Sequence, residues 1–367
     1  MTTLELLPNE LLDEVIFFLG LSFPPPSADR LHQPPNAQIT KGDQCLKKLS
    51  LVNSHFTKLV RPHLFSHSCF DIGDATRYLS FIAESDLVRY VTSIVIKGDY
   101  GYEYSKIWRL LFSIVTPRRL TLVAPPSVIG QMLNMQVNKE HIWAFEIPFQ
   151  VVYLECEQSK AKKTSPESIW SPLDALPWSS FLFNESSSLK AYNHYEYFLY
   201  KVPSIFHNFY QWVPAKPLAE RSRLLSSLAN LTSLTYVAVF PFYNHVQLVL
   251  DALDYMTNLR SLKIQMSPSG NDRVIELEQR GSMDPSDPWM ELATGYSVIA
   301  QAVKNHGRAG CLEMFTACDY EMEAVRGEIE TVISHVLVDE PWTHDGRGTW
   351  TRTADAANGY STTNDNP

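Results

Sequence analysis

Glu155, Cys156 and Glu157 place a thiol between two carboxylates, a combination that could supply a nucleophile with a base or could bind a metal ion. These residues lie at the end of a segment, 149–156, whose composition predicts a β-strand. Because successive side chains of a strand point to opposite faces, we expect Cys156 inside the protein and both carboxylates outside it. The pattern therefore favours a packing role over a chemical one.

The other groups capable of chemistry are dispersed. His55 and His63 are eight residues apart in a helical segment and His67 follows a turn, so they do not form the convergent ligand set of a metal site. Four glutamates between residues 321 and 330 fit the solvated face of a helix. The motifs GxGxxG, GxxxxGK[ST], HExxH and GxSxG are absent. We therefore expect a protein that is not an enzyme and has no catalytic, cofactor-binding or metal-binding residues.

Aromatic side chains are dense between Tyr192 and Trp212. Part of this region, 189–200, is predicted to be a strand on which Tyr195 and Tyr197 share one face. The aromatic side chains either fill the middle of a domain or form a recognition surface, because tyrosine and tryptophan dominate binding hot spots. In the second interpretation Tyr195, Tyr197 and Trp212 bind a protein client.

Composition narrows the class of protein. The 367 residues are 45% apolar and 19% charged, which is typical of a globular protein, and the net charge of −9 argues against a nucleic-acid or anionic-membrane partner. The five cysteines are scattered, the N-terminus is acidic, and no apolar run reaches the length of a membrane span. We expect a soluble intracellular protein of the cytoplasm, the nucleus or both.

Two helical segments near the N-terminus carry more apolar surface than they need for each other. In LPNELLDEVIFFLG, Pro8 suits the first helical position and Gly20 a helix end. In LKKLSLVNSHFTKLVRPHLF, apolar residues recur every three or four positions, which predicts helices at 45–53 and 54–60 with Ser54 as N-cap and an interruption at Pro62. The excess apolar surface must be covered by the rest of the chain or by another protein.

Together these two segments resemble an F-box, in the form common in fungal proteins. The matching landmarks are Leu7, Pro8, Glu10, Leu11, Leu12, Ile16, Leu19, Leu46, Leu49, Val52, Phe56, Leu59, Val60, Pro62, Leu64 and Phe65. The resemblance implies a three-helix module that docks on the Skp-family adaptor of a cullin–RING ubiquitin ligase. It also implies two sets of residues. Those expected to bind the adaptor are Leu7, Pro8, Leu11, Ile16 and Leu49. Those expected to form the module's core are Leu12, Val15, Leu19, Val52, Phe56 and Leu59.

After Phe65 the sequence alternates between predicted strands and helices. The strands are expected at 89–98, 118–124, 149–156, 189–200, 234–240, 259–266 and 312–320, and the helices at 107–115, 219–231, 245–259, 289–305 and 321–337. Such alternation predicts a parallel sheet, either doubly wound or a solenoid. The segments ANLTSLTYVAVF and MTNLRSLKIQM resemble degenerate leucine-rich repeats, whose strands begin Leu-x-x-Leu.

The expected fold class is mixed α+β or α/β: a three-helix F-box followed by an irregular leucine-rich-repeat-like solenoid. The expected domains are an F-box at 3–68 with a proline-rich insertion at 21–45, a substrate-binding domain at 69–345, and an aromatic, glycine-rich end with a disordered tail at 346–367. The resemblance implies a substrate receptor of an SCF-type ligase, joined to a cullin through the adaptor and holding an unknown protein client. A repeat-type interaction scaffold outside any ligase and an enzyme with an unrecognised site are the alternatives.

Overall fold

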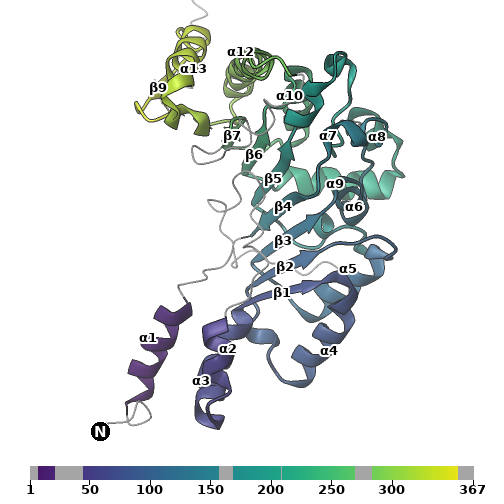
Figure 1. Ribbon diagram of the computed structural model, residues 1–367, viewed down its shortest axis with the longest axis vertical. Coiled ribbons are helices and arrows are strands. Elements are labelled where there is room, and N and C mark those ends of the chain that lie inside the picture. Colours follow the sequence, from purple (N-terminus) through teal and green to yellow (C-terminus); the bar gives the residue numbers. More distant parts are fainter. Residues whose placement is uncertain (1–6, 21–43, 157–167, 208, 269–282, 354–367) are drawn as a thin grey trace, which may run out of the picture.

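The computed structural model describes residues 7–20, 44–156, 168–207, 209–268 and 283–353. The expected proline-rich insertion therefore lies almost wholly outside the described residues, as does the tail after residue 353. The described chain has a mixed α/β fold in which three N-terminal helices precede a sheet that does not close on itself (Figure 1).

A single ten-stranded sheet runs through the molecule. The strands are β1 (His67–Asp71), β2 (Ser93–Lys97), β3 (Arg119–Ala124), β4 (Gln150–Glu155), β5 (Ser180–Ser187), β6 (Ser233–Val239), β7 (Ser261–Gln265), β8 (Met314–Ala317), β9 (Trp342–His344) and β10 (Thr349–Arg352). Strands β1 to β8 lie side by side in chain order, and β10 and then β9 follow β8. All neighbours among β1 to β8 are parallel except at β4, which is antiparallel to both β3 and β5.

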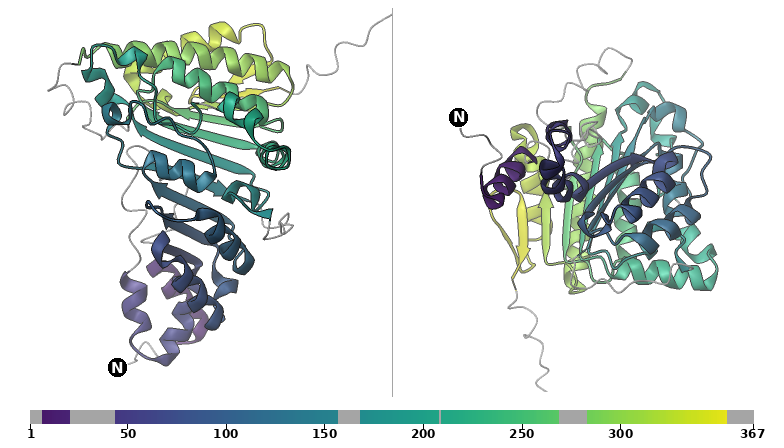
Figure 2. Two further views of the ribbon diagram at one scale, coloured as in Figure 1. Left: turned by 90° about the vertical axis from the view of Figure 1, so that its right-hand side faces the viewer. Right: turned by 90° about the horizontal axis from the view of Figure 1, so that it is seen from below.

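Three α-helices precede the first strand, and the others lie in connections between strands. The α-helices are α1 (Asn9–Gly20), α2 (Gln44–Ser50), α3 (Ser54–Ser66), α4 (Ala75–Glu84), α5 (Tyr104–Ile114), α6 (Pro126–Leu133), α7 (Ile142–Phe145), α8 (Phe209–Ala215), α9 (Leu218–Ala229), α10 (Tyr243–Asp251), α12 (Asp287–Arg308) and α13 (Glu323–Val336). Figure 2 shows the connecting helices gathered along one face of the sheet, while α1 to α3 form a lobe at the β1 end.

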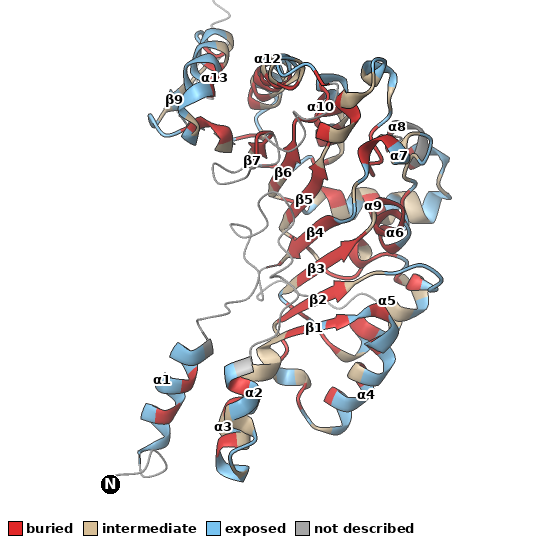
Figure 3. Cartoon of the chain, in the orientation of Figure 1, coloured by how far each residue is buried: buried red, intermediate tan, exposed pale blue. Residues whose placement is uncertain are grey.

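Strand register explains how the sheet holds one continuous core. In-register partners place Ile94, Leu120, Leu154 and Phe181 in a single row, which continues through Leu234, Leu262, Phe315 and Trp350. All eight side chains are at most 3% exposed and face the helices. Alternate strand residues face the other way, where Val95, Val151 and Leu182 belong to a second, smaller cluster. Figure 3 shows the strands as the most buried part of the chain.

Most of the strands expected from the sequence are present. Six segments overlap β2, β3, β4, β6, β7 and β8, and each of the five helices expected after Phe65 overlaps an observed helix. The prediction of a strand at 189–200 was wrong, because this segment forms two 3-10 helices, Leu189–Asn193 and Tyr197–Leu199, and the neighbouring strand is β5. The sheet also continues through β10, beyond the boundary at 345 that we expected for the second domain.

Two local expectations for the third helix are corrected. Asn53, rather than Ser54, is the N-cap, since its side-chain Oδ1 accepts a hydrogen bond of 2.8 Å from the backbone N–H of Phe56. Pro62 does not end the helix, which continues to Ser66. Proline removes only one backbone N–H, and the carbonyl of exposed Lys58 that loses its partner can be hydrated.

Asp319 joins three elements at one end of the sheet. Its buried carboxylate accepts hydrogen bonds from the backbone N–H groups of Met266 (2.7 Å) and Ser267 (3.0 Å), from the Ser267 hydroxyl (2.6 Å) and from the Tyr296 hydroxyl (2.6 Å). Burial raises the pKa of Asp319, and these hydrogen bonds oppose that rise. The carboxylate thereby links the end of β7 to α12 and to the segment after β8.

Replacing Asp319 with alanine should destabilise the protein strongly, because four donor groups would lose a buried acceptor. We expect Asp319→Ala to lower the free energy of unfolding by about 3–5 kcal/mol, whereas Tyr296→Phe, which removes a single hydrogen bond, should cost about 1–1.5 kcal/mol. Urea denaturation followed by circular dichroism measures both changes. Equal costs for the two variants would contradict a shared-acceptor role for Asp319.

Candidate protein-docking surface

The three N-terminal helices form a module with a small core of its own. Helix α1 packs on α3 and α2, and α2 packs on α3. The core consists of Ile16, Leu46 and Val60, with Leu49, Leu59 and Leu64 packed against them. On α1, Leu12 and Ile16 are each only 1% exposed, and they are one helical turn apart. A short helix with two fully buried positions leaves most of its circumference uncovered.

About half of the exposed residues of the module are apolar. We use the term N-terminal apolar surface for the exposed residues Leu7, Pro8, Leu11, Val15, Phe17, Phe18, Leu19, Leu51 and Val52. The exposed fraction reaches 65% for Phe18 and 85% for Leu51. Single exposed apolar residues are ordinary, but several on neighbouring turns of one small module are characteristic of an interaction site.

The residues expected to bind an adaptor divide into three groups. Leu7, Pro8 and Leu11 are exposed at the start of α1, where the Pro8 carbonyl accepts hydrogen bonds from the N–H groups of Leu11 and Leu12. Leu49 is half-buried in the module. Ile16 is buried in its core, so it cannot contact a partner without unfolding the module.

The expected core residues also divide. Leu12 and Phe56 are buried and Leu59 is half-buried, but Val15, Leu19 and Val52 are exposed. Val15 and Leu19 are each 37% exposed, and Val52, in the turn between α2 and α3, is 62% exposed. The structure therefore places these three residues on the N-terminal apolar surface instead of in the core.

Within the described residues, α3 makes the main connection between the module and the sheet. Helix α3 ends at Ser66 and β1 begins at His67, and the Ser66 carbonyl accepts hydrogen bonds from the Thr92 N–H (3.0 Å) and hydroxyl (2.9 Å). Figures 1 and 2 show α1 on the outer side of this lobe, away from the connecting helices. The start of α1 therefore does not stack on the sheet.

The residues expected to bind a client lie apart. Tyr195 is 94% exposed, whereas Tyr197 is half-buried and packs against Tyr192 and Phe242, with ring centroids 4.7 and 5.6 Å apart. The two tyrosines do not share a strand face, because the segment is not a strand. The side chain of Trp212 lies outside the described residues.

One buried pair has the residue types of an acid–base site. His245 Nε2 lies 2.8 Å from Glu185 Oε2, and the Tyr236 hydroxyl donates a hydrogen bond to the same carboxylate. Burial raises the pKa of Glu185, but attraction by His245 and hydrogen bonds from His245, Ser204 and Tyr236 outweigh it and hold the pKa below its ordinary value. His245 and Glu185 are at most 2% exposed, so the geometry favours a structural link between β5, β6 and α10.

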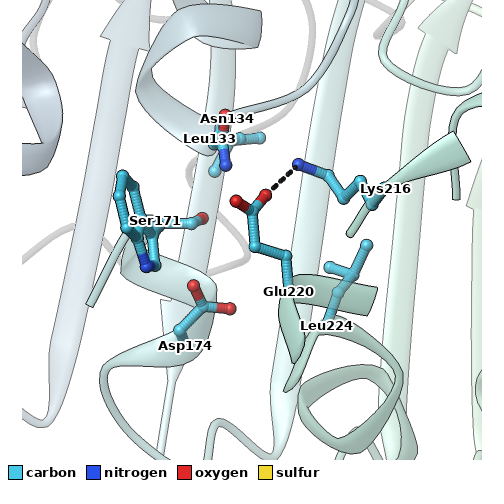
Figure 4. Close-up of a pocket in the computed structure, with 8 residues that line it drawn as sticks. Leu133, Asn134, Ser171, Asp174, Lys216, Glu220 and Leu224 are labelled. Atoms are coloured by element: carbon cyan, nitrogen blue, oxygen red, sulfur yellow. Dashed lines mark hydrogen bonds and ion pairs between the residues drawn. The ribbon is translucent and has the colours of Figure 1, made fainter. Parts of the chain in front are cut away.

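The remaining candidate is a small pocket between α6, α9 and the segment 170–174 (Figure 4). Its lining residues are Leu133, Asn134, Trp170, Ser171, Asp174, Lys216, Glu220 and Leu224. Lys216 Nζ is 3.3 Å from Glu220 Oε2, and the space beside this pair is sufficient for about one water molecule. A pocket of this size does not hold an organic substrate.

Other kinds of site are not found among the described residues. No group of three or more histidine, cysteine, aspartate or glutamate side chains there could hold a metal ion. Within the same ranges, no helix is both long enough and apolar enough to cross a membrane. Cys156 is buried as expected, and Glu155 lies on the opposite face beside Arg118 and Arg119. Glu157 is outside the described residues.

Comparison with known proteins gives no match: no family model, no curated protein and no solved structure is significantly similar to this chain.

Core and surface residues of the module should respond differently to substitution. Phe18→Ser and Leu51→Ser should change the free energy of unfolding by less than about 0.5 kcal/mol, because both side chains are mostly in solvent. Leu12→Ala, in contrast, removes a buried side chain and should cost about 2–4 kcal/mol. Guanidinium denaturation followed by circular dichroism distinguishes the two. A large loss in Phe18→Ser would show that its ring is covered by the same chain.

Asp174 should make stability depend on pH. Burial raises its pKa to about 6 in the folded protein, although backbone hydrogen bonds from Trp170 and Ser171 oppose this. Because the folded state binds this proton more tightly than the unfolded state, Asp174 should stabilise the protein increasingly as the pH falls from about 7 through 6 toward 4. Relative to Asp174→Asn, the wild type should gain about 1–2 kcal/mol between pH 7 and 4.5.

Urea denaturation at several pH values measures this difference. Asp86→Asn is a suitable control, since Asp86 has an 85% exposed side chain. A constant difference between wild type and Asp174→Asn across the pH range would rule out the raised pKa.

Proposed function

We propose that this protein is a substrate receptor of an SCF-type cullin–RING ubiquitin ligase, and that its N-terminal module is an F-box that binds a Skp-family adaptor. The observation that carries the proposal is the exposure of Leu7, Pro8 and Leu11 on a three-helix module. These residues are at the positions where the sequence resembles the docking segment of an F-box. A foreign subunit would remove their apolar surface from water.

The amount of exposed apolar surface fits a protein partner. A stable interface buries roughly 1,600 Å² in total, or about 800 Å² on each side, and its centre is apolar and aromatic. The N-terminal apolar surface supplies two phenylalanines and several aliphatic residues, bordered by Asp13, Glu14 and Lys48. An apolar centre with a charged border is the composition expected of such an interface.

The order of the strands supports a leucine-rich-repeat-like solenoid for the second domain. A doubly wound sheet reverses its strand order partway along, whereas β1 to β8 follow the chain without a reversal. Each strand then contacts mainly its neighbours in the chain, as in repeat proteins. The antiparallel β4 and the uneven spacing between strands make this an irregular example.

The proposed activity needs no reacting group in this chain. A receptor accelerates ubiquitin transfer by holding a client's lysine near a charged conjugating enzyme, so that its contribution is proximity. For this purpose the docking module and the client-binding domain must be connected stiffly. Helix α3 leads directly into β1, and hydrogen bonds between Ser66 and Thr92 hold this connection in place. Such a connection is expected to be stiff.

The alternative of a scaffold whose N-terminal helices merely cap the solenoid is less well supported. A capping helix stacks its apolar residues on the first repeat. In this structure Leu7, Pro8 and Leu11 face solvent, and α1 contacts α2 and α3.

The proposal predicts that a purified Skp-family adaptor binds the full chain and that Leu7→Ala combined with Pro8→Ala abolishes this binding. The double variant should weaken binding at least about 30-fold, since it removes apolar contacts from the centre of the interface. Isothermal titration or co-purification measures the effect.

Pro217 and Leu218 provide a matched control. They form another exposed Pro–Leu pair at the start of a helix, and Leu218 is 69% exposed. Pro217→Ala combined with Leu218→Ala should leave adaptor binding unchanged. Retained binding in the Leu7 and Pro8 variant, with the fold intact, would contradict the assignment of the docking surface.

A further inference from the structure

A second exposed apolar surface lies away from the N-terminal module, at the edge of the sheet where β5, β6 and β7 end and β4 begins. Residues that follow β5, β6 and β7 meet at one edge of the sheet, because these strands are parallel. Helix α7 precedes β4, and since β4 runs in the opposite direction, α7 reaches the same edge. Four separate connections therefore contribute to this part of the surface.

These connections present aromatic and aliphatic side chains to solvent. We define the rim patch as Trp143 on α7, Tyr195, Phe198 and Leu199 after β5, and Tyr243 at the start of α10. Their exposed fractions are 57%, 94%, 56%, 59% and 45%.

Ring contacts beneath the rim patch hold it in place. The Trp143 ring lies 5.7 Å from that of Tyr200, and the Tyr197 ring packs 6.0 Å from that of Phe198. The Tyr200 N–H also donates a 2.9 Å hydrogen bond to the Tyr197 carbonyl. The exposed side chains are thus supported by packed aromatic neighbours.

Among the described residues, carboxylates around this patch outnumber cations. Tyr197 shares a hydrogen bond with Asp287, and Glu291 Oε2 accepts a 2.7 Å hydrogen bond from the Tyr243 N–H. Asp284 lies beside Asp287, and Glu196 is exposed between Tyr195 and Tyr197. Two lysines in the described segments are paired with other carboxylates: Lys190 with Glu146 at 3.2 Å and Lys201 with Glu140 at 3.0 Å. Even with exposed Lys139 just before α7, the described residues at the rim patch carry more carboxylates than cations.

The carboxylates of this group repel one another. Burial raises the pKa of Asp287, and repulsion from Asp284 raises it further. Burial also raises the pKa of Glu291, with an added contribution from Asp287. A bound cation would relieve this repulsion, and the adjacent rings can also attract a cation through their faces.

We propose that the rim patch binds a cationic, apolar segment of a client protein, in which arginine or lysine side chains alternate with large apolar ones. The apolar side chains would cover Tyr195 and Phe198, and the cations would pair with Glu196, Asp287 and Glu291. This inference deepens the proposed function by naming the client's chemistry, and it rests on that function only in calling the bound segment a client.

Three labelled twelve-residue peptides test the inference with the purified full chain, without adaptor. The first alternates arginine, leucine and serine, the second has glutamate in place of each arginine, and the third has serine in place of each leucine. By fluorescence anisotropy the first should bind at least about tenfold more tightly than either of the others, and raising the salt concentration should weaken it.

Two variants and one control locate the binding surface. Tyr195→Ala with Phe198→Ala, and Glu196→Gln with Asp287→Asn, should each weaken binding of the first peptide at least about fivefold. Leu218→Ala combined with Glu328→Gln removes an exposed leucine and a glutamate elsewhere and should leave binding unchanged. Equal binding of the three peptides, no binding of the first, or wild-type affinity in both rim variants would overturn the inference.

Adaptor binding is measured on the same proteins and separates the two proposals. The rim variants should bind the adaptor as the wild type does. Loss of peptide binding with retained adaptor binding supports the rim patch as an independent surface. If the wild type does not bind the adaptor, the ligase assignment fails while the peptide result continues to test the rim patch.

Discussion

The fold depends on an apolar row of side chains that crosses the sheet from β2 to β10. Ile94, Leu120, Leu154 and Phe181 begin this row, and β6, β7, β8 and β10 each add one buried residue at the same level. The helices on that face bury the row, so its area removed from water is continuous along the molecule. The row passes through the reversed β4 without interruption, which shows that register, and not strand direction, is the constraint on the core.

The buried core lies between strands that follow one another in the chain. The β1 end of the sheet and the edge where β5, β6 and β7 end therefore carry two separate exposed surfaces. At the β1 end, the helical module keeps a small separate core and leaves the rest of its apolar residues in solvent. At the edge where β5, β6 and β7 end, the connections are long enough to display aromatic residues. The central strands position both surfaces but contribute few exposed side chains to either.

The sequence predicts the elements whose local pattern agrees with their environment. The starts of β6 and β7 alternate between buried apolar residues and half-buried or polar ones, and this alternation predicts both strands. The buried residues are Leu234, Tyr236, Leu262 and Ile264. β5 was missed because the aromatic run after it has a higher strand propensity, yet tertiary packing of Tyr192 and Tyr197 turns that run into 3-10 helices. On α1 the apolar residues nearly encircle the helix, so periodicity alone could not distinguish buried Ile16 from exposed Val15.

The direct connection from α3 to β1 sets the distance between the helical module and the rim patch. Helix α3 ends at Ser66 and β1 begins at His67, so no linker separates the helical module from the sheet. The distance from the module to a given strand therefore increases by about 4.8 Å for each strand between them. The strands bearing the rim connections are three to six positions from β1, or roughly 15–30 Å. Gain or loss of one strand and its helix would therefore change the distance between the helical module and the rim patch by one strand spacing.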